Sequence, residues 1–430
     1  LMENLEYQNY VHIRQMVKYL NDYYKKNKLN VIFNTDVYKI NRIESNNLFQ
    51  ISTNKSNFKC KKLIMAAGLF KPHKMKIAGA IPYSELTTDK KKFLNKNVLI
   101  IGQGNSGFET ADHLIDTAAV IHIAGKGPLK FAWQTHYVGH LRAVNNNFLD
   151  TYLLKSQNGL TGLDDDEIVV RKNGKFFIYD TSDKTYDNQG PPEGYDYVID
   201  CTGFEIDTSI FSNIKPDHNG KVPLLKSNFE SQNIKNLFFA GVLSQHIAYK
   251  KSSGAFIHGF RYLIRSMIDI ETNSYRKTTI NNKNELINKI LDRINNGSGI
   301  FQMFGCLADF VIIYQNKFIY IEEIPIKYIK SNFLNKYDSI LIITLDYGDF
   351  GGVIENSRDL GNASYVFGED RVTGAEPKNA HLSNFIHPVF RLYTNNKFKK
   401  EFHLSEHLMT QYKLKDIHIK PLTNFISKLN

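Results

Sequence analysis

The sequence NVLIIGQGNSG, residues 97–107, joins an apolar run to a glycine-rich turn. The run is rich in β-branched residues and stops at a G-x-G-x-x-G motif, after which apolar side chains recur at helical spacing. This order of strand, turn and helix predicts a βαβ unit whose glycines bring the backbone close to the pyrophosphate of a dinucleotide, at the helix N-terminus. Ser106 and Glu109 have the spacing of a capping box, which predicts the start of the helix.

The second strand of this unit is predicted at residues 120–123. An NAD-binding unit usually carries Asp or Glu after that strand, to bind the ribose, but this chain has Ala124, Gly125 and Lys126. A lysine there favours NADP over NAD, because it is able to pair with the 2′-phosphate. The alternative is a glycine turn in an unrelated α/β domain, with a lysine present by chance.

Composition limits the class of protein. A chain of 430 residues is expected to form two or three domains. The net charge of +11 comes from lysines scattered among asparagines, without a basic block, so nucleic acid is not an expected partner. No apolar run approaches the ~18 residues of a transmembrane helix. Cys60, Cys201 and Cys306 lie too far apart for a C-x-x-C redox pair and are expected to be small buried side chains.

The residues before the glycine motif predict an amphipathic helix over 13–24 and then three strands. The strand-like runs are residues 31–43, 48–53 and 58–66. The third ends in Ala66-Ala67-Gly68, where small residues permit close approach of the backbone to a flat or phosphorylated group. This order is typical of flavoproteins in which an NADP-binding domain is inserted into an FAD-binding domain. The glycine motif for FAD is then expected upstream of Leu1, and the alternative is a protein that works without FAD.

Further small-residue turns follow the βαβ unit. Residues 197–204 are predicted to form a strand that ends in a small-residue turn at Gly203, where the chain of such a flavoprotein returns to its FAD-binding domain. Residues 237–241 are predicted to form a buried strand that ends at Gly241. Ser253, Gly254 and Ala255 then open an apolar helix at residues 256–270, whose N-terminus is expected to face the flavin or its pyrophosphate.

Between these turns, residues 131–152 are rich in polar side chains and contain the only Trp. Asn145 is able to hydrogen-bond a nicotinamide amide, and Arg142 is able to pair with a phosphate. His136 or His140 is able to transfer protons near neutral pH. His136 and Asn145 are the catalytic candidates. The alternative is a surface helix with solvated histidines.

The chain beyond residue 272 is predicted to form a smaller α+β module, after a polar boundary at residues 274–284. Its predicted helices are residues 285–295 and 300–314, and its predicted strands are residues 317–323, 339–346 and 388–394. Four histidines, at positions 381, 387, 403 and 407, match no ligand spacing, so no metal is expected.

Several long motifs resemble one family: GQGNSGFETA from residue 102, WQTHYVGHLRAVNNNFLDTYLLKSQNGL from residue 133, KSSGAFIHGFRY from residue 251 and LSNFIHPVF from residue 382. They are similar to the FAD-dependent oxidoreductase domain-containing protein 2 family, also called the endoplasmic reticulum flavoprotein associated with degradation. The resemblance covers nearly the whole chain. It implies FAD and NADP(H) as cofactors, a place in the endoplasmic reticulum lumen, and partners among the degradation components that handle misfolded glycoproteins. Signal and retention sequences are not found in residues 1–430, so the location rests on the resemblance.

The expected fold class is α/β: a two-dinucleotide-binding flavoprotein fold, with an NADP domain inserted in a partial FAD domain and an additional C-terminal α+β module. The expected parts are residues 1–90 (remainder of the FAD domain), 91–200 (NADP domain), 201–272 (return to the FAD domain) and 285–430 (C-terminal module). The expected cofactor-binding residues are Gly102, Gln103, Gly104, Asn105, Ser106, Gly107, Lys126, Ala67, Gly68, Gly203, Gly241, Ser253, Gly254 and Ala255.

The expected function is transfer of a hydride from NADPH to FAD, with an acceptor that no motif identifies. A non-catalytic nucleotide-binding adaptor of the degradation machinery is one alternative, favoured by the lack of a dithiol and of an obvious base. A flavin monooxygenase is the other. The GQGNSG motif resembles that of the monooxygenases, but Tyr83 stands where their fingerprint before this motif has a His.

Overall fold

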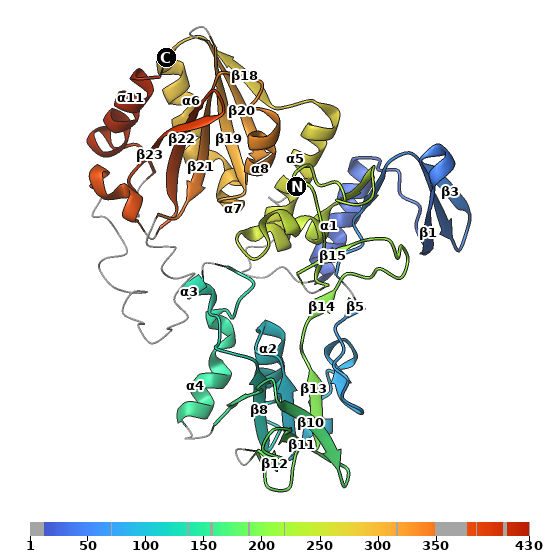
Figure 1. Cartoon of the computed structure of the whole chain (residues 1–430). Coiled ribbons are helices and arrows are strands. Elements are labelled where there is room, and N and C mark those ends of the chain that lie inside the picture. The colour runs from blue at the N-terminus through green and yellow to red at the C-terminus, as the bar shows by residue number, and fades with distance from the viewer. Residues whose placement is uncertain are drawn as a thin grey trace. The chain divides into compact units, whose positions relative to one another are not determined.

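The computed structural model describes residues 13–69, 71–135, 137–154, 158–187, 190–218, 220–314, 317–348, 376–383, 385–406 and 411–429 (Figure 1). The chain divides into two compact units. The first is Leu1–Lys61 with Ser209–Ser212, and the second is Lys62–Thr208 with Asn213–Asn430.

The first unit contains helix α1 (Ile13–Lys26) and an antiparallel sheet of β1 (Val37–Ile43), β2 (Leu48–Thr53) and β3 (Asn57–Cys60). The predicted helix and the order of three strands are confirmed, but the first strand begins at Val37 and not at residue 31. The Ile40 N–H donates to the Ile210 carbonyl at 2.7 Å, which ties residues 209–212 to the sheet. The single strand predicted at residues 58–66 is wrong: β3 ends at Cys60 and β4 (Leu63–Met65) belongs to another sheet. The exposed Lys61 and Lys62 separate the two strands.

The βαβ unit lies in a five-stranded parallel sheet of the second unit, in the order β6-β13-β7-β8-β9. The strands are β6 (Ile81–Pro82), β13 (Tyr197–Asp200), β7 (Asn97–Ile101), β8 (Val120–Gly125) and β9 (Leu160–Gly162). Every residue of the central strand β7 is buried, as its continuous apolar run requires in a parallel sheet. Helix α2 (Asn105–Leu114) packs Phe108, Ala111 and Leu114 into the same core.

A separate antiparallel sheet follows β9 in the chain. It consists of β10 (Glu167–Lys172), β11 (Lys175–Asp180) and β12 (Thr185–Tyr186). β10 and β11 form a hairpin that turns at Asn173-Gly174. Both turn residues have positive φ, +51° and +83°, as a type I′ turn requires.

Two short strand pairs accompany the two chain crossings predicted for an inserted domain. β5 (Lys71–Pro72) and β14 (Phe204–Glu205) pair antiparallel, so the outgoing and returning segments run side by side (Figure 1). β4 pairs parallel with β17 (Leu237–Phe239). The elements that follow are a hairpin of β15 (Pro216–Asp217) and β16 (Val222–Pro223), the 3-10 helices η6 (Gly241–Ala248) and η7 (Ser253–Ala255), and α5 (Ile257–Thr272).

The C-terminal module is a six-stranded antiparallel sheet in the order β18-β20-β19-β21-β22-β23. The strands are β18 (Lys277–Ile280), β20 (Lys317–Pro325), β19 (Leu307–Tyr314), β21 (Ser339–Asp346), β22 (His387–Thr394) and β23 (Lys397–His403). The helices are α6 (Lys283–Asn296), α7 (Ser298–Gln302), α8 (Ile326–Asn332) and α11 (Lys420–Ser427), with the 3-10 helix η9 (Pro377–Leu382) and the π-helix η10 (Lys415–Ile419).

Two expectations about the module are corrected. The helix predicted over residues 300–314 is wrong: α7 ends at Gln302, Gly305 follows with a φ of +63°, and the apolar residues that come next form the buried strand β19. The polar stretch expected as a boundary contributes the edge strand β18. Edge strands face solvent and therefore lack the apolar pattern of a central strand.

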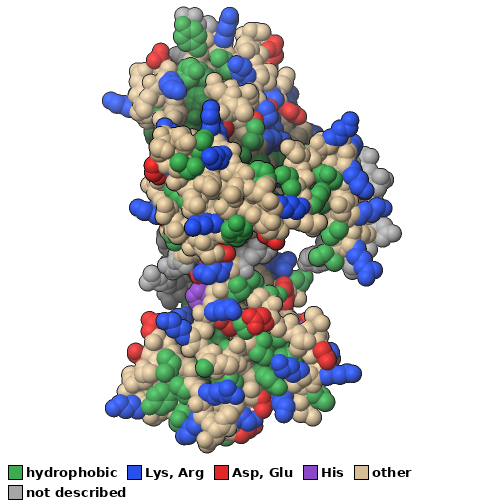
Figure 2. All heavy atoms as spheres, turned by 90° about the vertical axis from the view of Figure 1, so that its right-hand side faces the viewer, with side chains coloured by type: hydrophobic (Ala, Val, Ile, Leu, Met, Phe, Trp, Pro, Cys, Tyr) green, Lys and Arg blue, Asp and Glu red, His purple; other side chains and the backbone are tan. Residues whose placement is uncertain are grey.

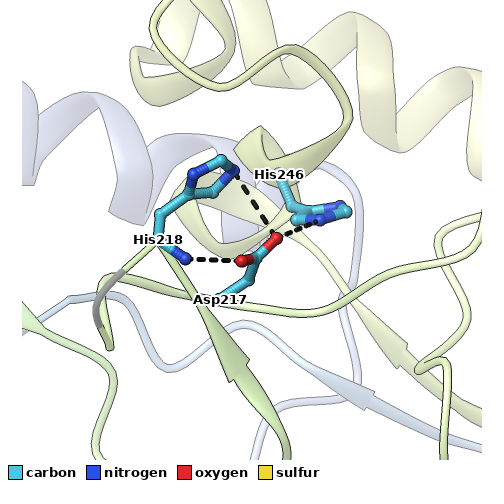
Figure 3. A group of neighbouring side chains, drawn as sticks. All are labelled: Asp217, His218 and His246. Atoms are coloured by element: carbon cyan, nitrogen blue, oxygen red, sulfur yellow. Dashed lines mark hydrogen bonds and ion pairs between the residues drawn. The ribbon is translucent and has the colours of Figure 1, made fainter.

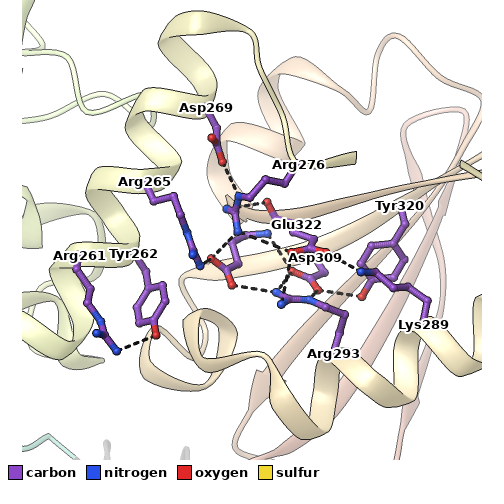
Figure 4. Close-up of polar contacts among 11 residues, drawn as sticks. Arg261, Tyr262, Arg265, Asp269, Arg276, Lys289, Arg293, Asp309, Tyr320 and Glu322 are labelled. Atoms are coloured by element: carbon purple, nitrogen blue, oxygen red, sulfur yellow. Dashed lines mark hydrogen bonds and ion pairs between the residues drawn. The ribbon is translucent and has the colours of Figure 1, made fainter. Parts of the chain in front are cut away.

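A buried network of charges joins α5 to the module (Figure 4). Arg293 of α6 donates to Asp309 of β19 through Nε (2.7 Å) and Nη2 (3.2 Å), and to Glu323 of β20 (2.9 Å). Arg265 of α5 also donates to Glu323, and Arg276 does so at 3.0 Å. The network therefore fixes α5 against the sheet with ion pairs instead of apolar contacts alone.

The remaining short elements are η2 (Glu44–Asn46), η3 (Tyr83–Glu85), η4 (Lys90–Phe93), α3 (Ala132–Thr135), η5 (Ala143–Asn145) and α4 (Asn147–Leu154). In the described ranges, none of the helices has the length and apolar character needed to span a bilayer. On the face in Figure 2, Lys and Arg side chains are scattered among acidic ones, as expected of a chain without a basic patch.

Candidate dinucleotide site

The three motif glycines have different roles in the structure. Gly102 has a φ of +119°, and a Cβ added to it would lie 2.5 Å from the Cys201 carbonyl oxygen. A Cβ on Gly107 would lie 2.0 Å from the Gly102 carbonyl oxygen. Both glycines are therefore required by the fold. A Cβ on Gly104 would meet nothing within 4 Å, so this glycine borders open space beside the start of α2.

The capping box predicted at Ser106 and Glu109 is wrong, because helix α2 starts before Ser106. The N-cap is Gly104, without a side-chain cap, and α2 begins at Asn105. The carboxylate of Glu109 instead accepts hydrogen bonds from Arg142 and Asn145, both at 3.3 Å. The first turn of α2 thus keeps its N–H groups for an anion, which fits the pyrophosphate of a dinucleotide beside Gly104.

Asn105 and Asn145 hold the loop around residues 139–145 against α2. The Asn105 amide donates to the carbonyls of Gly139 (3.1 Å) and His140 (2.8 Å), and its oxygen accepts from Asn145 at 2.7 Å. Asn145 is buried, and its amide nitrogen donates to Asn105 Oδ1 and to Glu109 Oε1. This geometry places Asn145 as a support of the loop beside the glycine turn.

Gln103 and Lys126 lie where β7 and β8 end. The Gln103 side chain packs over Gly125, where an added Cβ would come within 2.5 Å of it. Lys126 is exposed and forms an ion pair with Asp165, which lowers the pKa of that carboxyl. Sequence patterns did not reveal Asp165 as the partner, because it lies in the loop after β9, 39 residues further along the chain.

The expected flavin side is built on the parallel pair β4 and β17. Ala67 and Gly68 follow β4, with Ala67 exposed and Gly68 at a φ of +78°. Gly241 follows β17 at a φ of +67°, and an added Cβ would meet nothing within 4 Å. Because parallel strands end at one sheet edge, these turns lie together, and their open backbone fits a second nucleotide group.

The other expected residues on this side have closer neighbours. Gly203 has a φ of +93°, and an added Cβ would lie 3.5 Å from Lys221 Nζ. Ser253 and Gly254 are buried in η7 with Ala255, and a Cβ on Gly254 would lie 3.4 Å from Met303 of the C-terminal module. The apolar helix predicted to start at residue 256 begins at Ile257, after the N-cap residue Phe256.

Of the two histidines predicted as candidates for proton transfer, the structure describes only His140. His136 lies outside the described residues. The ring of His140 is 2.7 Å from the Thr135 hydroxyl, and burial, followed by the charges of Lys250 and Lys130, lowers its pKa to about 4. His140 is therefore neutral at physiological pH, which makes it a poor general acid there.

We expect His140 to make the protein less stable in mild acid. An unfolded histidine titrates near pH 6.5, so between about pH 6.5 and 4 the unfolded state binds a proton that the folded state does not. Thermal unfolding midpoints at pH 7.5 and pH 5 measure this loss. His140→Gln should reduce the difference between the two midpoints, whereas the control His113→Gln, on α2, should not. Equal pH dependence in His140→Gln and the unsubstituted protein would contradict the buried neutral ring.

The cysteines offer no thiol pair. All three are free, and burial raises the pKa of Cys201 and of Cys306 to about 12. Cys201 and Cys306 are thus confirmed as buried side chains, and Cys60 is half-buried. Such protonated thiols are unreactive, so any electron transfer by this chain does not use a cysteine pair of its own.

Comparison with known proteins defines the class first. The family model for pyridine nucleotide-disulphide oxidoreductases matches residues 3–241, more than half of the chain. The parallel sheet with its glycine turn and the paired crossing strands lie within that match. The predicted fold class, a two-dinucleotide-binding flavoprotein fold with an added α+β module, is confirmed.

Two relatives define the family. The FAD-dependent oxidoreductase domain-containing protein 2 of Mus musculus is 30% identical over 470 aligned residues, which cover 96% of this chain and 69% of the relative. The protein of the same name from Danio rerio is 30% identical over 484 aligned residues, which cover 95% of this chain and 69% of that relative. The chain belongs to the FAD-dependent oxidoreductase domain-containing protein 2 family. Its predicted class, an FAD-dependent oxidoreductase with a pyridine nucleotide as second cofactor, is confirmed at this level.

Solved structures give more distant similarities. A bacillithiol disulfide reductase from Staphylococcus aureus has a TM-score of 0.41 and 18% identity, with 56% of this chain and 74% of that chain covered. A flavin-containing monooxygenase from Stenotrophomonas maltophilia has a TM-score of 0.43 and 16% identity, and the match covers 55% of this chain and 70% of that chain.

Proposed function

We propose that this protein oxidises NADPH, with the NADPH pyrophosphate on the glycine turn of residues 102–107 and FAD beside the turns after β4 and β17. The observation that carries the proposal is the open space beside Gly104 at the uncapped start of α2. An α-helix N-terminus presents free N–H groups and a positive dipole, and both favour a pyrophosphate. Anaerobic reduction of the flavin by NADPH is the test.

The residues of this chain supply placement and charge. When bound, the nicotinamide and the flavin supply the hydride chemistry. Gly102 and Gly107 hold the turn close to β13 and α2, which keeps the N-terminal N–H groups in place. Asn105 and Asn145 fix the loop of residues 139–145 beside this turn.

Lys126 supports NADPH over NADH. It stands at the end of β8, where a dinucleotide-binding unit contacts the ribose, and its ammonium is exposed. Its ion pair with Asp165 joins two exposed groups, so exchange of that carboxylate for a 2′-phosphate costs little.

Two substitutions test this preference in opposite directions. Lys126→Asp should weaken NADPH binding at least about tenfold and leave NADH nearly unchanged, because it removes a phosphate partner and adds repulsion. Asp165→Asn should strengthen NADPH binding, because it frees Lys126. Fluorescence titrations with both nucleotides at low salt give the affinities. Unchanged NADPH affinity in both variants would mean that Lys126 does not contact the cofactor.

We further propose a place in the endoplasmic reticulum lumen and a role with the degradation components that handle misfolded glycoproteins. Family membership supports this proposal, since similarity extends over 69% of the Mus musculus relative. In sealed microsomes the natural protein should resist added protease until detergent opens the membrane. Digestion without detergent would contradict a luminal place.

A second candidate function is a nucleotide-binding adaptor that catalyses no reaction. It is favoured by the three free cysteines, two of them buried, which leave no thiol pair to pass electrons to a disulfide. Such an adaptor would bind both cofactors without transfer of electrons between them, so flavin reduction separates the two candidates.

A further inference from the structure

Three potential metal ligands meet between the β15–β16 hairpin and η6, and none of them is a residue expected from the sequence to bind a ligand (Figure 3). Asp217 is the last residue of β15, His218 follows it, and His246 comes from η6. Asp217 Oδ2 lies 2.9 Å from His246 Nε2 and 3.7 Å from His218 Nε2, and one ligand atom from each residue falls within 4.8 Å of the others.

The chain holds these side chains in a convergent arrangement. The His218 N–H donates to Asp217 Oδ1 at 2.7 Å, which leaves Oδ2 facing both imidazoles. The ring of His218 stacks on Tyr249, with centroids 3.8 Å apart and planes within 10°. His218 also adopts a φ of +51°, a left-handed conformation that is unfavourable for a residue with a Cβ. The turn thus maintains an unfavourable backbone that places the ring beside the carboxylate.

The spacing fits one metal ion. Bonds of about 2.0–2.1 Å in a tetrahedral zinc site place neighbouring ligand atoms roughly 3.3 Å apart. The two measured separations from Asp217 Oδ2 lie on either side of that value. His246 Nε2 faces Asp217 Oδ2, and when Nε2 binds a metal the ring proton moves to Nδ1, which is buried without a hydrogen-bond partner of its own.

The donor set selects the kind of ion. Two imidazoles and one carboxylate suit zinc and its first-row neighbours, whereas magnesium and calcium prefer oxygen ligands alone. The Asp217 carboxylate places a negative charge beside both imidazoles, which favours a cation. The charge of Lys327 also acts on His246 and disfavours a cation there, so the affinity must come from the ligand bonds.

We propose that Asp217, His218 and His246 form a binding site for one divalent first-row transition metal ion, such as Zn²⁺, with a fourth position open to water or another ligand. No sequence motif reveals this site, because His246 is separated from Asp217 by 29 positions. The adjacent Asp217-His218 pair was the only local signal. The site does not depend on the proposed use of NADPH.

Metal titration of the protein, prepared without a histidine tag and stripped of metal, tests the site. Zn²⁺ competition against a chelating dye should give one equivalent per chain, and Co²⁺ should give visible absorption bands of a four- or five-coordinate ion. His218→Ala and His246→Ala should each weaken binding at least about tenfold. The control His113→Ala, on the exposed face of α2, should bind like the unsubstituted protein.

Asp217→Asn keeps the shape of the side chain and serves if the alanine variants do not fold. It should also weaken binding at least about tenfold. The proposal is overturned if the unsubstituted protein binds no equivalent of Zn²⁺ or Co²⁺. It is also overturned if an equivalent binds with the same affinity in His218→Ala, His246→Ala and Asp217→Asn.

Discussion

Replacing Gly107 with alanine is expected to abolish NADPH binding and to lower the free energy of unfolding by about 3 kcal/mol. The new Cβ would lie 2.0 Å from the Gly102 carbonyl oxygen, and both atoms are fixed by the backbone. Relief of the clash requires α2 to move away from β7, which also displaces the N–H groups expected to hold the pyrophosphate. Chemical denaturation and nucleotide titration measure the two effects.

Gly104→Ala is the matched comparison, because an added Cβ there meets no atom of the chain within 4 Å. Its unfolding free energy should stay within about 1 kcal/mol of the unsubstituted protein, the ordinary difference between Gly and Ala at a helix end. Its NADPH affinity should nevertheless fall at least about tenfold, because the methyl group occupies the space assigned to the pyrophosphate. Normal NADPH affinity in Gly104→Ala would show that the nucleotide does not bind there.

Replacing Arg293 with methionine is expected to destabilise the protein by about 3–5 kcal/mol. The Arg293 side chain is 12% exposed and pairs with Asp309, which is fully buried. Methionine keeps much of the apolar volume but leaves the Asp309 carboxylate without its cation, although the Tyr320 hydroxyl still donates to it at 2.9 Å. A buried charge that loses its partner keeps the cost of its desolvation.

Lys420→Met is the control for this substitution. Lys420 pairs with Asp416 one turn away, and both side chains are exposed, so the loss should be below about 1 kcal/mol. Urea denaturation of the two variants gives the comparison. If Arg293→Met lost no more stability than Lys420→Met, the buried network of α5, α6 and the sheet would not hold the C-terminal module in place.

Local patterns predicted the elements whose determinants lie within a few residues. The apolar run of β7 and its glycine turn specify strand, loop and helix together, and Asn173-Gly174 alone fixes a hairpin turn. The apolar run of β19 was predicted as a helix because a strand buried on both faces has no alternating pattern. Gly305 was the signal that separated it from α7.

The site was less predictable, because its contacts join distant residues. Ser106 and Glu109 have the spacing of a capping box, but Glu109 instead accepts from Arg142 and Asn145, 33 and 36 positions away. Asn145 had been considered for the nicotinamide, yet its amide is engaged by Asn105. The sequence identified the residue types of the site, while their partners depended on the tertiary fold.

Anaerobic stopped-flow mixing of the flavin-loaded protein with NADPH tests the central claim most directly. The account predicts bleaching of the flavin absorption, with a rate that saturates with NADPH concentration, and slower reduction by NADH at equal concentration. Gly104→Ala should require higher NADPH for the same rate. No bleaching at saturating NADPH would contradict the oxidoreductase assignment and would favour the nucleotide-binding adaptor.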